Sequence, residues 1–519
     1  MPLLYASMSN ETPLSQSDRQ ISEWLFILTL IACAYFYAGG GWNQNAQFDL
    51  TRAIVEDHAF AIDRFAGNTG DLSRHGSHVY ANKAPGLSLL AAIPYALIFA
   101  FEHGRYEAGS AVLQSVNTYA CTVLTVAILA ALVPAVLYRE GRRRGMPPLW
   151  IATVALTIAL ATEMWPYSTM FVAQVPSAAF MFLAFILASR DTGAAQITAG
   201  ALAGLAGITN YLCIPAAAAI TIYVLFHSRH SAAAAARVMA GGAPFAAMLM
   251  VYQKITCGGF FTTPMSTMDE RFVTKGATLG ILQRPSMEAL YEISIGPYRG
   301  LLFFAPVLVM VLAGIVLRFR DGRDRSELFA LVAISAIFIA FNVSFNNWEG
   351  GFGIGARYLV PVIPLWGLVM LHCRGWQKLL LIVLALVSFG INFTATAVDP
   401  QPSGTIPRPL TQYLLPLLVD GRFSPNVPIT PPWSAQTFTG HTSVNRFTHD
   451  EPVVFFRHGP GSVDAEWASF NLGEPFFGAG DARSLIPIAV ILAIGAAAIL
   501  AKARQVERQS RATMQRPSD

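Results

Sequence analysis

The stretch VLQSVNTYACTVLTVAILAALVPAVL fills residues 112–137, and YREGRRR follows it at residues 138–144. The first stretch has no charged side chain and exceeds the ~20 residues that a helix needs to cross the ~30 Å apolar core of a bilayer. The second stretch contains four arginines, which is typical of a loop on the cytoplasmic side of a membrane. Residues 112–144 therefore predict a transmembrane helix whose end faces the cytoplasm.

The composition extends this prediction to the whole chain. Of the 519 residues, 54% are hydrophobic and only 13% are charged, and the mean hydropathy is +0.47. So few polar side chains cannot cover the surface of a soluble domain of this size. Because apolar runs of spanning length recur along the chain, the expected fold class is all-α integral membrane.

Charge placement sets the expected topology. Arginine and lysine cluster in short connections, which the positive-inside rule assigns to the cytoplasm. Ten predicted spans then alternate without conflict, at residues 149–165, 171–189, 194–209, 211–227, 236–254, 300–317, 328–345, 358–373, 379–396 and 484–501.

The N-terminal part needs one apolar run that does not cross. If residues 22–39, 86–102 and 112–137 all crossed, the arginine-rich loop after them would lie outside. The run 86–102 is short, contains Pro94 and is followed by charged residues, so we expect a juxtamembrane helix there. The prediction is about twelve transmembrane helices plus this one, with both termini in the cytoplasm.

This topology divides the chain into parts and places the long loops on one face. The first apolar run lacks a convincing cleavage site and is expected to remain as an anchor. Long loops that gather on the outer face suggest that the chemistry takes place there. The expected parts are a cytoplasmic N-terminus at 1–21, a transmembrane module at 22–396 with outer loops 40–111 and 255–299, an extracytoplasmic segment at 397–483, and a last helix with a basic cytoplasmic tail at 484–519.

The first outer loop contains ionisable residues just before the chain re-enters the membrane. Asp49 and Asp71 are candidate catalytic carboxylates, and Asn82 and Lys83 of the string Asn-Lys-Ala-Pro-Gly are candidate ligands of an anion. Charge at this depth is costly unless it is paired or used. The alternatives are a surface pair of Asp49 with Arg52 on one helix face, and a Lys83 side chain that only reaches toward lipid headgroups.

Two arginines stand at the outer boundary of later helices, against the charge bias of the topology. Arg299 ends the string Gly-Pro-Tyr-Arg, and Arg357 with Tyr358 follows a glycine-rich stretch at residues 350–355. Glycines let backbone N–H groups approach a phosphate closely, and arginine can pair with a phosphate through two bonds. Gln174, at the head of a helix, is a further candidate ligand. Headgroup anchoring is the alternative for both arginines.

Other classes of site find little support. The sequence has no Gly-x-x-x-x-Gly-Lys, His-Glu-x-x-His or Cys-x-x-Cys string, so nucleotide hydrolysis and zinc chemistry of these kinds are not expected. His75 and His78 could join Asp71 at a divalent metal, with solvated loop histidines as the alternative, so the cofactor requirement stays open. A net charge of +4 gives no reason to expect a nucleic-acid partner.

Together these features resemble a known superfamily. An outer loop with Lys-x-Pro, a non-crossing helix after it, an arginine-rich inner loop and an Arg-Tyr pair at the start of a late helix are similar to the C-superfamily (GT-C) of glycosyltransferases. The resemblance covers about residues 20–400 and extends to the protein O-mannosyltransferases and the bacterial aminoarabinose transferase of lipid A. It implies a sugar carried on polyprenyl phosphate, with Lys83 near the carrier phosphate and Tyr358 at the carrier site.

The sequence departs from that superfamily where an acidic pair is implied. Gln44 and Asn45 occupy those positions, and amides cannot accept a proton as a general base. Gln174 and Asn210 likewise stand near an aspartate and a lysine of the related enzymes. The resemblance therefore implies that Asp49 or Asp71 removes the acceptor proton, while Lys83, Arg299 and Arg357 hold the phosphate.

The expected function is an integral-membrane glycosyltransferase that moves a hexosyl or pentosyl group from a polyprenyl-phosphate sugar to an extracytoplasmic glycan, lipid or protein. We expect it in the bacterial inner membrane with its active site outward, with membrane lipid and the donor as partners and no nucleic acid. A transporter or flippase of a lipid-linked substrate is one alternative, although transporters usually place their polar sites near the midplane. A non-catalytic membrane scaffold is the other.

Overall fold

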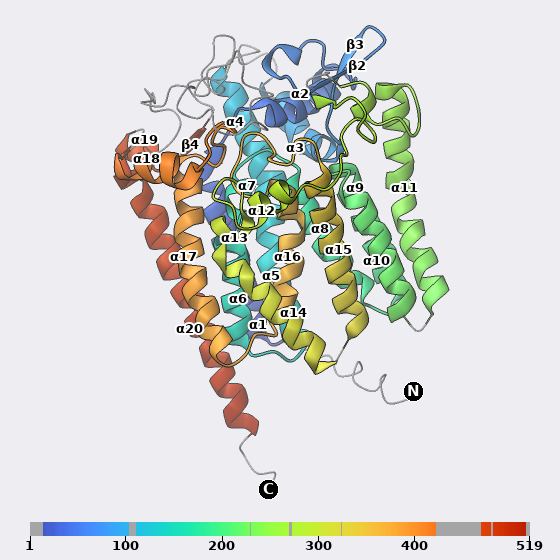
Figure 1. The fold of residues 1–519 in the computed structure, drawn as a ribbon. Helices are drawn as coiled ribbons and strands as arrows, with labels where there is room; N and C mark the ends of the chain where they lie inside the picture. Colours follow the sequence, from blue (N-terminus) through green and yellow to red (C-terminus); the bar gives the residue numbers. More distant parts are fainter. Residues whose placement is uncertain are drawn as a thin grey trace.

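The computed structural model describes residues 14–102, 111–228, 230–268, 272–322, 324–421, 469–478 and 481–514. Within these ranges the chain is a bundle of helices with two short antiparallel strand pairs at one end (Figure 1). Five of the described helices are long and apolar enough to cross a membrane, and further apolar helices of 10–17 residues stand between them. The predicted all-α integral membrane class is confirmed, while the exact number of crossings stays a prediction.

The elements follow the predicted order closely. The helices that build the bundle are α1 (Gln16–Ala34), α4 (Ala111–Thr122), α5 (Ile128–Arg143), α6 (Pro148–Leu160), α8 (Gln174–Ala188), α9 (Gly193–Thr209), α10 (Cys213–His227), α11 (Ser231–Cys257), α14 (Met310–Asp321), α15 (Arg325–Ser344), α16 (Ile363–Met370), α17 (Trp376–Val398) and α20 (Ile486–Met514). The shorter elements are α2 (Trp42–Glu56), α3 (Gly86–Glu102), α7 (Met164–Ser168), α12 (Met287–Ser294), α13 (Leu301–Phe304), α18 (Leu415–Val419), α19 (Glu474–Phe477), β1 (Phe36–Ala38), β2 (Leu72–His75), β3 (His78–Ala81) and β4 (Ser469–Asn471).

The two ends of the chain are joined through a strand pair. β1 directly follows α1, β4 precedes α20, and the two strands pair in antiparallel register from Phe36–Asn471 to Ala38–Ser469. The Tyr35 hydroxyl also donates to the Ser484 carbonyl oxygen at 2.5 Å. Because these strands lie at one end of the bundle, the start of α1 and the end of α20 lie at the other end (Figure 1). This agrees with the prediction that both termini face the same side.

Close helix packing explains the alanine- and glycine-rich part of the sequence. A Cβ added at Gly200 of α9 would lie 1.8 Å from the Val238 carbonyl oxygen of α11, and one added at Gly241 would lie 2.0 Å from the Ile197 carbonyl oxygen. Small residues allow two helix backbones to approach in this way without a hydrophobic driving force between them. The alanine-rich stretch near residues 231–248 thus belongs to a helix, α11, that packs closely on α9.

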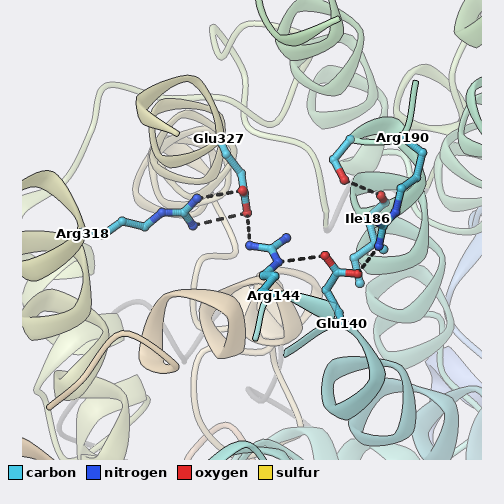
Figure 2. Close-up of polar contacts among 7 residues, drawn as sticks. Glu140, Arg144, Ile186, Arg190, Arg318 and Glu327 are labelled. Atoms are coloured by element: carbon cyan, nitrogen blue, oxygen red, sulfur yellow. Dashed lines mark hydrogen bonds and ion pairs between the residues drawn. The ribbon is translucent and has the colours of Figure 1, made fainter. Parts of the chain in front are cut away.

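The end of the bundle that carries the arginine-rich connections is held by a network of ion pairs (Figure 2). Glu140 of α5 pairs with Arg144 at 2.8 Å and with Arg190, which follows α8. Glu327 of α15 pairs with Arg144 at 2.9 Å and with Arg318 of α14 at 2.7 Å. Both glutamates are buried, so the network joins the ends of four helices in a place where an unpaired charge would be costly.

Several predicted boundaries are wrong for local reasons. The span predicted at 149–165 ends at Leu160, where the chain turns into the short α7, and the span predicted at 300–317 is interrupted at Ala305 before α14. The helix that carries Asp49 and Arg52 is α2. The β2–β3 hairpin was not predicted. Residues 422–468 of the segment predicted at 397–483 lie outside the described residues.

Candidate functional site

Lys83, Asp71 and Arg357 form a charged cluster at the end of the bundle opposite the ion-pair network. The Lys83 Nζ lies 3.0 Å from the Asp71 Oδ2. Arg357 lies within electrostatic reach of both groups. We call these three residues the cationic cluster, because it holds two positive charges and one negative charge. The sequence prediction that Lys83, Asp71 and Arg357 belong to one site agrees with this arrangement.

The β2–β3 hairpin brings Asp71 and Lys83 together. Leu72 pairs with Ala81 at the open end of the hairpin, and the Asn82 N–H donates to the Asp71 carbonyl oxygen at 3.0 Å. Asp71 directly precedes the first strand and Lys83 follows the second by one residue, so strand pairing alone makes them neighbours. The hairpin is tied to the outer loop after α11, because the Arg74 N–H donates to the Thr267 carbonyl oxygen at 2.9 Å.

The start of α3 fixes the other side of the Lys83 loop. A Cβ added at Gly86 would lie 2.7 Å from the Cα and backbone nitrogen of Thr209, at the end of α9. Only glycine allows this contact, and the contact anchors the loop just after Pro85. Residues 82–85 therefore run between two fixed points, the hairpin and α9.

Burial and neighbouring charge act on the Lys83 ammonium in opposite directions. Burial is the largest influence and lowers the pKa of Lys83; the Asp71 carboxylate opposes that shift, and the Arg357 guanidinium adds to it. The net effect is a pKa below the ordinary lysine value of 10.5. An anion bound to this group would favour the charged form and raise the pKa again.

Arg299 holds the glycine-rich loop, which we define as residues 350–355. Its guanidinium donates to the carbonyl oxygens of Gly351 and Gly353, and it lies over the Tyr298 ring at 4.4 Å. The side chain is only 1% exposed. Because each terminal nitrogen of the guanidinium donates to a loop carbonyl oxygen, Arg299 acts on any bound phosphate mainly by shaping this loop.

The glycines of this loop make room for polar side chains from other elements. A Cβ added at Gly350 would lie 2.7 Å from the Arg357 Nε. One added at Gly353 would lie 2.6 Å from the Tyr167 hydroxyl, and one at Gly355 would lie 2.8 Å from the Glu163 Oε1. Gly350 and Gly355 also have φ angles of +75° and +58°, a backbone conformation that disfavours residues other than glycine. The side chains of Arg357, Tyr167 and Glu163 therefore lie close to the backbone of the loop. The sequence suggests that the same backbone could also contact a phosphate.

The other predicted ligands lie around the cluster. Tyr358 accepts a hydrogen bond from the Arg357 Nη2 at 3.2 Å, and its ring packs on Phe341 and Phe345. Asn82 and Gln174 are buried, and the side-chain oxygen of each has no hydrogen-bond partner among the described residues. Gln174 begins α8, which packs against the short helix η6 (Arg357–Val362).

Asp49 is buried on α2. Its charge acts on Arg52, which forms an ion pair with Glu56 at 2.8 Å. Burial opposes the charge of Arg52, but its bond to Glu56 and the charge of Asp49 raise its pKa. The structure places Asp49 in the ion-pair system of α2, and Arg52 has Glu56 as its direct partner.

The two loop histidines are engaged separately. The His78 Nδ1 lies 2.7 Å from the Asp63 Oδ2, and the His75 ring lies against Gly258. In the part of the chain that the structure describes, no group of three or more His, Cys, Asp or Glu side chains is placed to hold a metal ion.

Gln44, which stands where the resemblance implies an acid, has a structural role. Its Nε2 donates to the carbonyl oxygens of Ala38 and Gly40, both at 2.8 Å, and its Oε1 accepts from the Phe171 N–H at 2.8 Å. The side chain is 1% exposed. These bonds need two donors and one acceptor, which an amide supplies and an ionised carboxylate does not.

Gln44→Glu is therefore expected to destabilise the protein by about 1–3 kcal/mol, because it leaves two buried carbonyl groups facing an acceptor. The measurement is the midpoint of thermal unfolding in detergent. Gln412→Glu is the matched control, since Gln412 is exposed and only accepts a bond from the Arg408 N–H. Equal midpoints for the two variants would contradict this role for Gln44.

Sequence reasoning missed Glu163. It lies between α6 and α7, is 0% exposed, and neither carboxylate oxygen has a hydrogen-bond partner in the described ranges. A carboxylate between two apolar runs was a usable signal, because ionisable residues at membrane depth are seldom without a function. Tyr167 of the neighbouring α7 is also buried, and its hydroxyl donates to the Ile354 carbonyl oxygen at 2.7 Å.

Comparisons with known proteins give two structural similarities. No protein-family model and no curated protein matches the chain. A crystal structure of ArnT from Cupriavidus metallidurans in the apo state is 14% identical, with a TM-score of 0.47, over 93% of this chain and 76% of that chain. The structure of the same protein bound to undecaprenyl phosphate is 15% identical, with a TM-score of 0.45, over 95% of this chain and 78% of that chain.

Proposed function

We propose that this integral membrane protein transfers a sugar from a polyprenyl-phosphate donor to an acceptor outside the cytoplasm. The observation that carries the proposal is the cationic cluster, in which Lys83 and Arg357 face a single carboxylate, Asp71. Two half-buried cations with one counter-charge leave a surplus of positive charge that a phosphate would balance. The resemblance of the Lys-x-Pro and Arg-Tyr strings to GT-C glycosyltransferases supports the same substrate class.

The cluster suits a phosphate leaving group. When the bond between the sugar and the phosphate breaks, negative charge grows on the phosphate, and fixed cations stabilise it more strongly than water does. Lys83 and Arg357 supply these charges, Asp71 orients the lysine, and Arg299 fixes the loop that presents Arg357. Tyr358, Asn82 and Gln174 are proposed to bind the donor around them.

The resemblance implies Asp49 or Asp71 as the proton acceptor. The ion pair of Asp71 with Lys83 favours a role on the phosphate side for this residue. Of Asp49 and Asp71, the sequence then leaves Asp49 as the candidate proton acceptor. The sugar is proposed to be a hexose or pentose, the acceptor an envelope glycan, lipid or protein, and the membrane the bacterial inner membrane with the cluster facing outward.

The test is transfer by the full chain in lipid nanodiscs with a radiolabelled polyprenyl-phosphate sugar and an envelope extract as acceptor. The enzyme is expected to consume donor and to release free polyprenyl phosphate. Accumulation of intact donor in the opposite leaflet of proteoliposomes would instead support the flippase alternative. Binding without consumption or movement would support a scaffold.

A further inference from the structure

Glu163 is a buried carboxyl group that the cationic cluster does not use. It lies in the bend between α6 and α7, where the missing side chain of Gly355 brings the glycine-rich loop next to its Oε1. The side chain is 0% exposed, and neither oxygen has a hydrogen-bond partner among the described residues. A carboxyl group in such a place costs several kcal/mol to ionise unless a ligand supplies a partner.

This group belongs to the same region as the cluster. The Tyr167 hydroxyl is within electrostatic reach of Glu163 as well as of Arg357 and Arg299. Tyr167 also touches the glycine-rich loop at Gly353, two residues before the contact of Glu163 with Gly355. One loop of six residues thus passes Arg357, Tyr167 and Glu163 in turn.

Asp71 and Glu163 differ in what their carboxylates can do. Asp71 is bonded to the Lys83 ammonium at 3.0 Å, so its carboxylate already has a cation as its partner. Glu163 has no cation bonded to it in the described part of the chain, and a carboxyl group that is costly to ionise is a stronger base. An inverting transfer also needs its base on the side of the sugar opposite the leaving phosphate, and therefore away from the phosphate-binding cations.

We propose that Glu163 is the catalytic base of this transferase, an inference that rests on the proposed function. Because the Glu163 side chain is fully buried against Gly355, the acceptor hydroxyl reaches its carboxyl group when the glycine-rich loop moves aside. Its oxygen forms a bond to the anomeric carbon of the donor sugar, and its proton passes to the Glu163 carboxylate. The bond from the anomeric carbon to the phosphate oxygen breaks, and its electron pair leaves with the polyprenyl phosphate, whose charge Lys83 and Arg357 neutralise.

The test compares Glu163→Gln and Glu163→Asp with wild type in nanodiscs. Glu163→Gln keeps the shape of the neutral carboxyl and is expected to lower kcat 10²- to 10⁴-fold. The KM for the donor and the binding of a short-chain polyprenyl phosphate are expected to stay within about twofold, because the phosphate contacts are untouched. Glu288→Gln, at the exposed start of α12, is the matched control and is expected to retain wild-type kcat.

The pH profile separates a base from a packing role. Wild-type kcat is expected to rise with pH as Glu163 ionises, and this rise is expected to be absent in Glu163→Gln. Glu163→Asp is expected to retain the rise with a displaced midpoint and a kcat between the other two. If Glu163→Gln fails to fold, Glu163→Asp tests the proposal instead. A pH dependence of kcat in Glu163→Asp with the same midpoint as in wild type would contradict the role of Glu163 as the base.

The two levels of the proposal fail in different ways. If the wild type binds polyprenyl phosphate but does not consume the donor, the proposed transferase function is contradicted. If the wild type is active and Glu163→Gln has an unchanged kcat and pH profile, only the assignment of Glu163 as the base is contradicted.

Discussion

Lys83→Ala is expected to reduce the affinity for a polyprenyl phosphate by about 30-fold to several thousand-fold, which corresponds to roughly 2–5 kcal/mol for truncating one partner of a half-buried charge pair. Two effects add up. The variant removes one of the two cations that face the phosphate. It also removes the ammonium that lies 3.0 Å from the Asp71 carboxylate, so the negative charge of Asp71 repels the ligand. Quenching of intrinsic fluorescence by a short-chain polyprenyl phosphate measures the affinity.

Two further variants separate these effects. Lys83→Ala combined with Asp71→Asn is expected to recover part of the loss, because the repelling carboxylate is gone. Lys83→Arg keeps the charge, and its binding is expected to hold at high pH. Wild-type binding is expected to weaken as pH rises through the lowered pKa of Lys83, since only the protonated ammonium attracts the phosphate. Full affinity in Lys83→Ala would exclude this residue from the donor site.

Glu327→Gln is expected to destabilise the folded protein by roughly 3–5 kcal/mol, because it leaves Arg144 and Arg318 without their shared counter-charge in a buried place. Glu327 stands in the first turn of α15 and Arg318 in the last turn of α14, so the substitution also removes a favourable interaction with the helix dipole. The free energy of unfolding in mixed micelles with increasing SDS measures the effect.

The control for this prediction is Glu507→Gln. Glu507 pairs with Arg511 one helical turn later, and the arginine is 74% exposed, so the loss is expected to stay below about 0.5 kcal/mol. Equal stability of the two variants would show that the buried network contributes no more than a surface pair.

The sequence carried enough information for most of the helices and for part of the site. The run predicted at 86–102 is the helix α3 (Gly86–Glu102), because apolar runs bounded by polar loops define helices well in a chain of this composition. Lys83 and Arg357 could be predicted because each is a cation at the outer boundary of an apolar run. Their nearness depends on the hairpin and on η6, which local patterns do not specify.

The roles of Arg299 and Gln44 could not be predicted, for a common physical reason. The acceptors of Arg299 and of Gln44 are backbone carbonyl groups, which every residue possesses and which leave no mark in the sequence. The position of Glu163 between two apolar runs is visible in the sequence, whereas its lack of a hydrogen-bond partner among the described residues is visible only in three dimensions.

The pairing of β1 with β4 has a consequence for how the protein is made. The ribosome synthesises β1 long before β4, so the β1 backbone groups that pair with β4 stay without these partners until the helices between the two strands have been made. The Leu472 N–H then bonds to the Tyr35 carbonyl oxygen at 2.9 Å, next to the strand pair. This end of the bundle is therefore completed only after β4 has been synthesised, and a chain that terminated before β4 would expose an open strand edge at β1.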